Sequence, residues 1–234
     1  MFEKTLGILQ IESEPLKFPG GMSYPGTFDF PVRRLMVRGA TTPRVIDGDK
    51  SICDAFVTHA RQLEHEGVAA IVSNCGFTGL FQAEVSAAVS IPVALSTLVM
   101  VPFVASTLPP GRKVGILTYD SDKLTDEHFV SAGWSRSGIP VSIAGIQGTD
   151  TWRRFLEPVP DIKLSELIGE VLMAARSLLK RDPEVGALVF ECTAFPLAAD
   201  TVRSETGLPV FDVLGLGRML IEMSAPRKSH TSNT

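Results

Sequence analysis

An internal repeat restricts the fold of this chain more than any other feature of its sequence. Cys75 follows the apolar run 68–73, and Cys192 follows the apolar run 185–190, 117 residues further on. Two more pairs of short segments recur in the same order, at spacings of 117 and 108 residues: Ile91-Pro92-Val93 with Leu208-Pro209-Val210, and Leu6-Gly7-Ile8-Leu9 with Val114-Gly115-Ile116-Leu117. Three matching pairs in the same order along the chain indicate that a single α/β unit was duplicated. Two facing copies would bring the two cysteines towards one cleft.

Composition and charge narrow the class of protein. With 234 residues, the chain can form one large domain or two units of about 110 residues. Hydrophobic residues make up 44% and charged residues 21%, as in an ordinary globular protein, and a net charge of −4 argues against nucleic acid or an anionic membrane as a partner. No apolar stretch approaches the roughly 20 residues of a membrane-spanning helix. Three cysteines without close pairing, and no secretory signal at the start, predict reduced thiols and a cytoplasmic location.

Short apolar runs alternate along the chain with longer helical patterns, which is typical of parallel βαβ units. We therefore expect an α/β protein with two parallel-sheet domains. Residues 1–110, together with a C-terminal helix in 214–234, are expected to form the first domain, and residues 111–213 the second. The predicted strands are 6–11, 68–73, 93–95, 113–119, 141–146, 185–190 and 210–213.

A segment rich in glycine and proline, residues 15–43, follows the first predicted strand. A loop of this length inside a compact domain is uncommon and usually functional, so we expect a lid or a subunit contact, which leaves a homodimer or higher homo-oligomer open. Asp47 or Asp49 is expected to cap the first long helix, and Asp161 is expected to cap a long amphipathic helix later in the chain. From Pro226 onwards we expect a disordered polar tail.

Cys75 and Cys192 are the strongest candidates for chemistry. Each follows a buried strand and lies near the start of a predicted helix, and ligands of open α/β sheets bind at the carboxyl ends of the strands. Free backbone N–H groups at a helix start favour a thiolate and attract a substrate carboxylate. Proton abstraction beside a carbonyl needs a base on one face, an acid on the other, and donors for the developing enolate. Two opposed thiols supply the base and the acid, so we interpret both cysteines as catalytic.

The residues around the cysteines and at the equivalent strand ends are candidates for substrate binding. They are Gln10, Asn74, Gly76, Phe77, Thr78, Thr118, Tyr119, Thr193 and Ala194. Gly76 and Ala194 are small enough to let backbone amides approach a ligand closely. Thr78 and Thr193 would serve equally well as helix caps. A single cysteine at a strand end is more often a small buried hydrophobic residue, and only the paired placement favours a functional role.

Motifs for cofactors and metals are absent from the sequence. There is no phosphate-binding loop, no His-Glu-x-x-His, no Cys-x-x-Cys and no Gly-x-Ser-x-Gly motif. His59 and His65 do not share one face of their helix, and His128 is expected on the surface. We therefore expect no metal, no cofactor and a small carboxylate-bearing substrate.

Two segments of the chain resemble a known superfamily. Asn74-Cys75-Gly76-Phe77-Thr78 and Glu191-Cys192-Thr193-Ala194-Phe195-Pro196 are similar to the paired cysteine motifs of the aspartate/glutamate racemase superfamily, and the similarity covers nearly the whole chain in order and spacing. The resemblance implies two flavodoxin-like (Rossmann-like) domains related by a pseudo-twofold axis, an active site at their interface, and cofactor-independent chemistry. It also implies that the two cysteines act as an acid/base pair, with Asn74, Thr78 and Thr193 holding the carboxylate.

Departures from the superfamily pattern bear on the substrate. Glutamate racemases carry Asp-Ser at the end of the first strand, where this chain has Gln10-Ile11-Glu12-Ser13. Phe77 and Phe195 favour a more apolar or larger ligand than glutamate. The arylmalonate decarboxylase branch uses only the second cysteine, whereas this chain carries both.

The sequence thus favours a cofactor-independent racemase or epimerase, in the manner of aspartate/glutamate or hydantoin racemases. Its substrate would be a small carboxylate, an amino acid or an amino-acid derivative. One thiolate would remove the Cα proton while the opposite thiol delivers another. Three alternatives stay open: a maleate-type cis–trans isomerase that acts by thiolate addition, a decarboxylase of the same superfamily, and a ligand-binding protein without catalysis.

Overall fold

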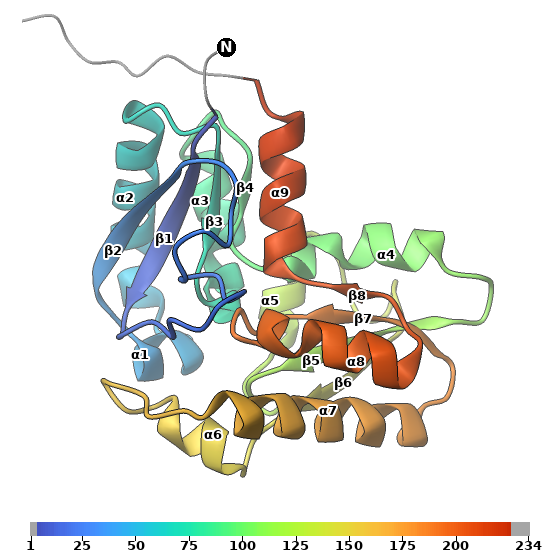
Figure 1. The fold of residues 1–234 in the computed structure, drawn as a ribbon. Helices are drawn as coiled ribbons and strands as arrows, with labels where there is room; N and C mark the ends of the chain where they lie inside the picture. The colour runs from blue at the N-terminus through green and yellow to red at the C-terminus, as the bar shows by residue number, and fades with distance from the viewer. Residues whose placement is uncertain (1–3, 226–234) are drawn as a thin grey trace, which may run out of the picture.

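The computed structural model describes residues 4–225, which form two four-stranded parallel sheets (Figure 1). The strand order is β2-β1-β3-β4 in the first sheet and β6-β5-β7-β8 in the second. Both halves thus place their second strand outside the first, as flavodoxin-like units do. The expected α/β fold of two parallel-sheet units is confirmed. The strands are β1 (Leu6–Glu12), β2 (Val32–Thr41), β3 (Ala70–Ser73), β4 (Val93–Ala94), β5 (Lys113–Thr118), β6 (Val141–Gly145), β7 (Val185–Phe190) and β8 (Val210–Phe211).

Helices connect the strands and cover the sheets. The longest, α7, buries Leu167, Val171, Ala175 and Leu178, which are spaced to form one apolar stripe along the helix. The helices are α1 (Thr42–Ile46), α2 (Cys53–His65), α3 (Gln82–Ala87), α4 (Val101–Thr107), α5 (Asp126–Ser131), α6 (Asp150–Arg154), α7 (Leu164–Arg181), α8 (Ala199–Thr206) and α9 (Val213–Met223), with the short 3-10 helices η1 (Lys50–Ile52), η2 (Gly76–Phe81), η3 (Thr97–Met100) and η4 (Phe195–Ala198).

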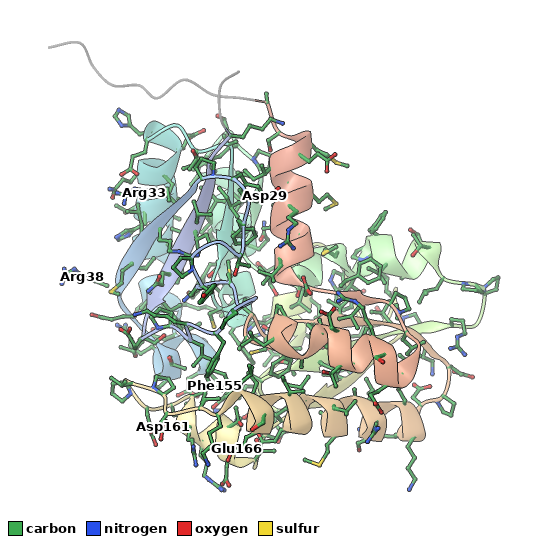
Figure 2. The ribbon with its side chains drawn as sticks, viewed as in Figure 1. Asp29, Arg33, Arg38, Phe155, Asp161 and Glu166 are labelled. Carbon is green, nitrogen blue, oxygen red and sulfur yellow. The ribbon has the colours of Figure 1, made fainter. Side chains whose placement is uncertain are left out.

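The segment 15–43 is not one loop, because it contains strand β2. This strand pairs in parallel with β1, from Leu6 opposite Val32 to Ile11 opposite Val37. As an edge strand it needs little apolar surface, and its arginines obscure the strand pattern in the sequence. Figure 2 shows Arg33 and Arg38 on the outer side of the first sheet. The irregular part of the segment is therefore residues 13–31.

Helix α9 returns to the first half of the chain. Asp212 caps it, because the carboxylate accepts a hydrogen bond of 2.9 Å from the N–H of Gly215. Figure 1 shows α9 beside the first sheet, on the opposite side from α2. Its apolar face completes a buried cluster of Leu6, Ile8, Met22, Phe28, Ala69, Ala70, Val72, Val213, Leu214 and Ile221. The domain limits at residues 110 and 214 remain a prediction.

Two predicted helix starts have different outcomes. Asp49 caps η1, since its carboxylate accepts from the N–H of Ser51 at 2.9 Å. Asp161 does not cap the long helix, because α7 begins only after Lys163 and the Asp161 carbonyl accepts a hydrogen bond from Arg154. The short helix α6 was not expected from the sequence. The polar tail from Pro226 lies outside the described residues.

Candidate active site

Cys75 and Cys192 lie at equivalent strand ends and line the same cavity. Cys75 follows β3 and precedes η2, and Cys192 lies between β7 and η4. The residues just before them, Asn74 and Glu191, are held in the same way, because their N–H groups donate to carbonyls of the neighbouring strands at 3.0 and 2.8 Å. The cavity has a volume of about 110 Å³, and residues from both halves of the chain form its wall. The repeat thus brings the two thiols together as predicted.

Burial raises the pKa of both thiols. The pKa of Cys75 is raised to about 12, first by loss of hydration and second by the charge of Glu191. The same two causes raise the pKa of Cys192 well above its ordinary value. Backbone N–H groups at the following helix starts act in the opposite direction: those of Phe77 and Thr78 on Cys75, and those of Ala194 and Phe195 on Cys192. Both groups are therefore thiols at neutral pH until a ligand changes their surroundings.

Asn74 and Thr193 connect the two cysteine loops. The hydroxyl of Thr193 donates a hydrogen bond to the backbone carbonyl of Asn74. The side-chain Oδ1 of Asn74 accepts from the N–H of Ile11 at 2.8 Å, which leaves the amide nitrogen for a ligand. Both residues line the cavity, together with Gly76 and Ala194. With Phe77 and Tyr119, six of the nine predicted binding residues are thus at the cavity wall.

Three other predicted binding residues do not line the cavity. The Thr78 hydroxyl donates to the carbonyls of Cys75 and Leu95, so it holds the first cysteine loop in place. The hydroxyl of Thr118 donates to Glu191 at 2.7 Å. Gln10 is 8% exposed and is not among the residues of the cavity wall. Their positions favour support of the site over direct contact with a ligand.

Aromatic rings form one side of the cavity. Phe77 and Tyr119 line it edge to face, with ring centroids 6.5 Å apart, and Tyr119 meets the ring of Phe155 edge to face at 5.8 Å. Tyr119 also stacks on Trp152 and donates its hydroxyl proton to that residue's carbonyl at 2.8 Å. His128 lies behind Phe77 at 5.4 Å and is 2% exposed, so the expectation of a surface position was wrong. Burial lowers its pKa, and the imidazole is neutral.

Segments from both halves cover the cavity. The loop 13–31 contributes Glu14, Leu16 and Met22 to its wall. On the other side, the connection between α6 and α7 contributes Phe155, which lies between the two halves in Figure 2. The loop 13–31 and the connection between α6 and α7 are in contact, because the N–H of Glu14 donates a hydrogen bond to the carbonyl of Pro158 at 3.3 Å.

The cavity carries acidic but no basic side chains. Glu14 and Glu191 line it, and no lysine, arginine or histidine among residues 4–225 does so. The same part of the chain has no group of three side chains arranged to hold a metal ion. It also has no helix long and apolar enough to cross a membrane. A bound anion would therefore rely on neutral hydrogen-bond donors, whereas a bound cation would meet carboxyl groups and aromatic faces.

Comparison with protein families agrees with this arrangement. The profile of the Asp/Glu/hydantoin racemase family matches residues 32–217. The chain belongs to this family. The match spans both cysteines and every described strand except β1, so the resemblance seen in the cysteine motifs is confirmed. Members of this racemase family belong to a superfamily of enzymes.

Curated relatives of this racemase-family chain are dimethylsulfoniopropionate lyases. One from Durusdinium sp. clade D is 28% identical over 216 residues, which cover 90% of this chain and 71% of the relative. Dimethylsulfoniopropionate lyase 3 of Emiliania huxleyi is 25% identical and aligns with 89% of this chain, but with only 56% of its own length. The chain thus spans between about half and seven tenths of the length of these relatives.

Solved structures support the racemase-family fold. An arylmalonate decarboxylase is 17% identical with a TM-score of 0.57, and the alignment covers 96% of both chains. A glutamate racemase from Bacillus anthracis is 14% identical with a TM-score of 0.57, covering 94% of this chain and 80% of the racemase. At these identities the likeness concerns the fold alone.

Three wall residues to which a role is given in this racemase-family site, Glu14, Glu191 and Phe155, were not predicted as functional from the sequence. In the sequence, Glu191 is notable only as part of the second cysteine motif, although the repeat makes it the equivalent of Asn74. Phe155 gave no signal, because it follows the unexpected helix α6 and reaches the cavity only through the packing of that segment.

Proposed function

We propose that this chain is a cofactor-independent lyase that acts on dimethylsulfoniopropionate or a closely similar β-sulfonio carboxylate. A cysteine thiolate would remove the proton next to the carboxylate, and the β-carbon would lose its sulfur substituent. The observation that carries the proposal is the alignment of about nine tenths of the chain with curated dimethylsulfoniopropionate lyases. The lining of the cavity supports it independently.

The lining suits a sulfonium cation. Such a cation is attracted to the faces of aromatic rings, and Phe77, Tyr119 and Phe155 supply them. Glu14, on the loop that covers the cavity, adds a carboxylate that pairs with Lys17 at 2.7 Å. Within residues 4–225, no basic side chain lines the cavity wall to oppose the cation. The carboxylate end of the substrate would bind neutral donors, among them the amide nitrogen of Asn74.

The bound sulfonium cation would also lower the raised pKa values of the two thiols. An opposite charge within a few ångströms lowers the pKa of a thiol, so a bound sulfonium ion favours the thiolate where the empty cavity does not. The thiolate then takes the Cα proton, a C=C bond forms, and the electron pair of the C–S bond leaves with sulfur. The products are dimethyl sulfide, acrylate and a protonated cysteine, and both atoms and charge balance.

Purified protein with dimethylsulfoniopropionate tests the proposal directly. We expect dimethyl sulfide in the headspace and the vinyl protons of acrylate in the proton NMR spectrum, formed together in equal amounts. The variant with serine at both Cys75 and Cys192 is the control and is expected to form neither product. A folded wild-type protein that releases neither product from this substrate would rule out the lyase assignment.

A racemase or epimerase is the second candidate, because the two thiols occupy equivalent positions in the repeat. Two-base exchange needs an acid and a base on opposite faces of one carbon, which such a pair can supply. In D₂O, this activity would remove the Cα–H signal of a chiral amino acid, hydantoin or hydroxy acid without forming an alkene. Exchange without elimination would favour this candidate over the lyase.

The aromatic wall leads to a specific prediction. Tyr119→Leu is expected to raise KM for the sulfonium substrate about tenfold, the equivalent of about 1.4 kcal/mol of lost cation–π attraction, with a smaller effect on kcat. Tyr119→Phe is the matched control, because it keeps the ring and removes only the hydrogen bond to Trp152. Steady-state kinetics of both variants give KM and kcat and so test this prediction. If both variants raise KM equally, then the hydroxyl matters and the ring does not bind the cation.

A further inference from the structure

Glu191 breaks the symmetry of the repeat at the centre of the site. Its equivalent in the first half is Asn74, and each residue directly precedes a cavity cysteine. Glu191 is 0% exposed, and its Oε2 accepts the only hydrogen bond that its side chain makes among residues 4–225, from the Thr118 hydroxyl at 2.7 Å. Its other oxygen, Oε1, is buried without a partner in that part of the chain. A buried carboxyl group in this state is costly when charged.

The carboxyl group of Glu191 lies against the loop of the opposite cysteine. A side-chain carbon added at Gly76 would lie 2.3 Å from Oε1 and 2.1 Å from the backbone oxygen of Glu191. Because Gly76 directly follows Cys75, the acid packs on the backbone of the first cysteine loop while it is covalently adjacent to Cys192. Glu191 is thus adjacent to Cys192 in the sequence, and its carboxyl group lies against the loop that carries Cys75.

We propose that Glu191 is a positioning residue that couples the two thiols: a charge on its carboxyl group disfavours the thiolate at both cysteines, and loss of that charge favours it. The carboxyl group acts through the cysteines and need not touch the substrate. This inference goes beyond the proposed function, which requires a thiolate but does not say what controls its formation.

The electrostatics of the site agree with this coupling. Burial raises the pKa of Glu191 to about 7, and the bond from Thr118 acts in the opposite direction. After burial, the charge of Glu191 is the largest cause that raises the pKa of each cavity thiol. Two other titratable groups belong to the described cavity wall: Tyr119, whose pKa burial raises, so it is neutral, and Glu14 on the covering loop, whose carboxylate pairs with Lys17. No basic side chain of the cavity wall, within residues 4–225, offsets the carboxylate.

Alkylation of the cysteines tests the coupling without any substrate, so its result is separable from the test of the lyase activity. The full chain is treated with iodoacetamide between about pH 6 and pH 10, and the modification rate of each cysteine is followed by mass spectrometry. Glu191→Gln is expected to speed the alkylation of Cys75 and Cys192 about tenfold at pH 8, because removing a like charge a few ångströms away lowers a thiol pKa by a unit or more. Glu191→Asp keeps the charge and is expected to keep the slow rate.

Cys53 is an internal control in the same experiment. It lies at the start of α2, and the charges that raise its pKa are those of Glu84 and Asp54. Its alkylation rate is therefore expected to be the same in every variant. A parallel rise at all three cysteines in Glu191→Gln would indicate general loosening and would overturn the coupling.

Thr118→Val changes the pKa of the same carboxyl group without replacing Glu191 itself. Loss of the Thr118 hydroxyl removes a bond that lowers the Glu191 pKa, so the acid stays neutral to higher pH and both cavity thiols react faster between about pH 7 and pH 8. This variant decides the question if Glu191→Gln does not fold. Wild-type alkylation profiles in folded Glu191→Gln or folded Thr118→Val would overturn the proposal.

Discussion

Serine in place of the cavity cysteine that takes the proton is expected to lower turnover of dimethylsulfoniopropionate by about 10²–10⁴-fold. The serine hydroxyl is close in size to the thiol, so the cavity keeps its shape, but it does not ionise in this pH range and cannot serve as the base. Elimination needs only one base, and the second thiol then has a lesser role. We therefore expect Cys75→Ser and Cys192→Ser to differ, with one severe loss and one loss of about tenfold or less.

The comparison of the two variants also separates the candidate functions. Two-base racemisation uses both thiols in each turnover, so it requires that both serine variants fail to a similar extent. The measurement is kcat/KM for each variant, with folding checked by circular dichroism. Cys53→Ser is the matched control, because this third cysteine lies in α2 and does not line the cavity. A loss below threefold in both cavity variants would show that neither thiol is catalytic.

The repeat made the centre of the site predictable. Parallel strands of one sheet have their carboxyl ends at the same edge, so a matched cysteine at the end of a strand in each half could be assigned to a common cleft from the order of residues alone. The paired strand order follows from the same duplication. Edge strand β2 was missed because Arg33, Arg34 and Arg38 interrupt its apolar pattern, and an edge strand tolerates this.

The rest of the site depends on contacts between segments far apart in the sequence. Nothing in the order of residues shows that Glu191 is fully buried, because its burial depends on Thr118 of β5 and on the loop at Gly76. Phe155 becomes part of the wall only because the connection between α6 and α7 folds over the cavity. Thr78 was predicted as part of the first cysteine motif and Thr118 from its place at a strand end, but their hydroxyls are already used to hold other residues.

The buried acid also makes the stability of the protein depend on pH. The Glu191 pKa is raised from 4.5 to about 7 in the folded chain, so the folded state holds this proton more tightly than the unfolded state does. Its contribution to stability is thus fully present below about pH 4.5 and is lost as the pH rises through about 7. A shift of this size corresponds to about 3 kcal/mol in the free energy of unfolding.

Glu191→Gln removes this group and is expected to remove that part of the pH dependence. Between about pH 4 and pH 8, the free energy of unfolding of the wild type should fall by about 3 kcal/mol more than that of the variant, as measured by urea denaturation at each pH. Glu66 and Asp182, whose pKa values are lowered by hydrogen bonds, act in the opposite direction, but they are present in both proteins and cancel in the difference. Glu222→Gln, at an exposed position on α9, is the control and should keep the wild-type profile. Equal pH dependence in wild type and Glu191→Gln would mean that the acid keeps its ordinary pKa in the folded chain, and an acid that is charged throughout the pH range of the alkylation experiment could not control the thiols.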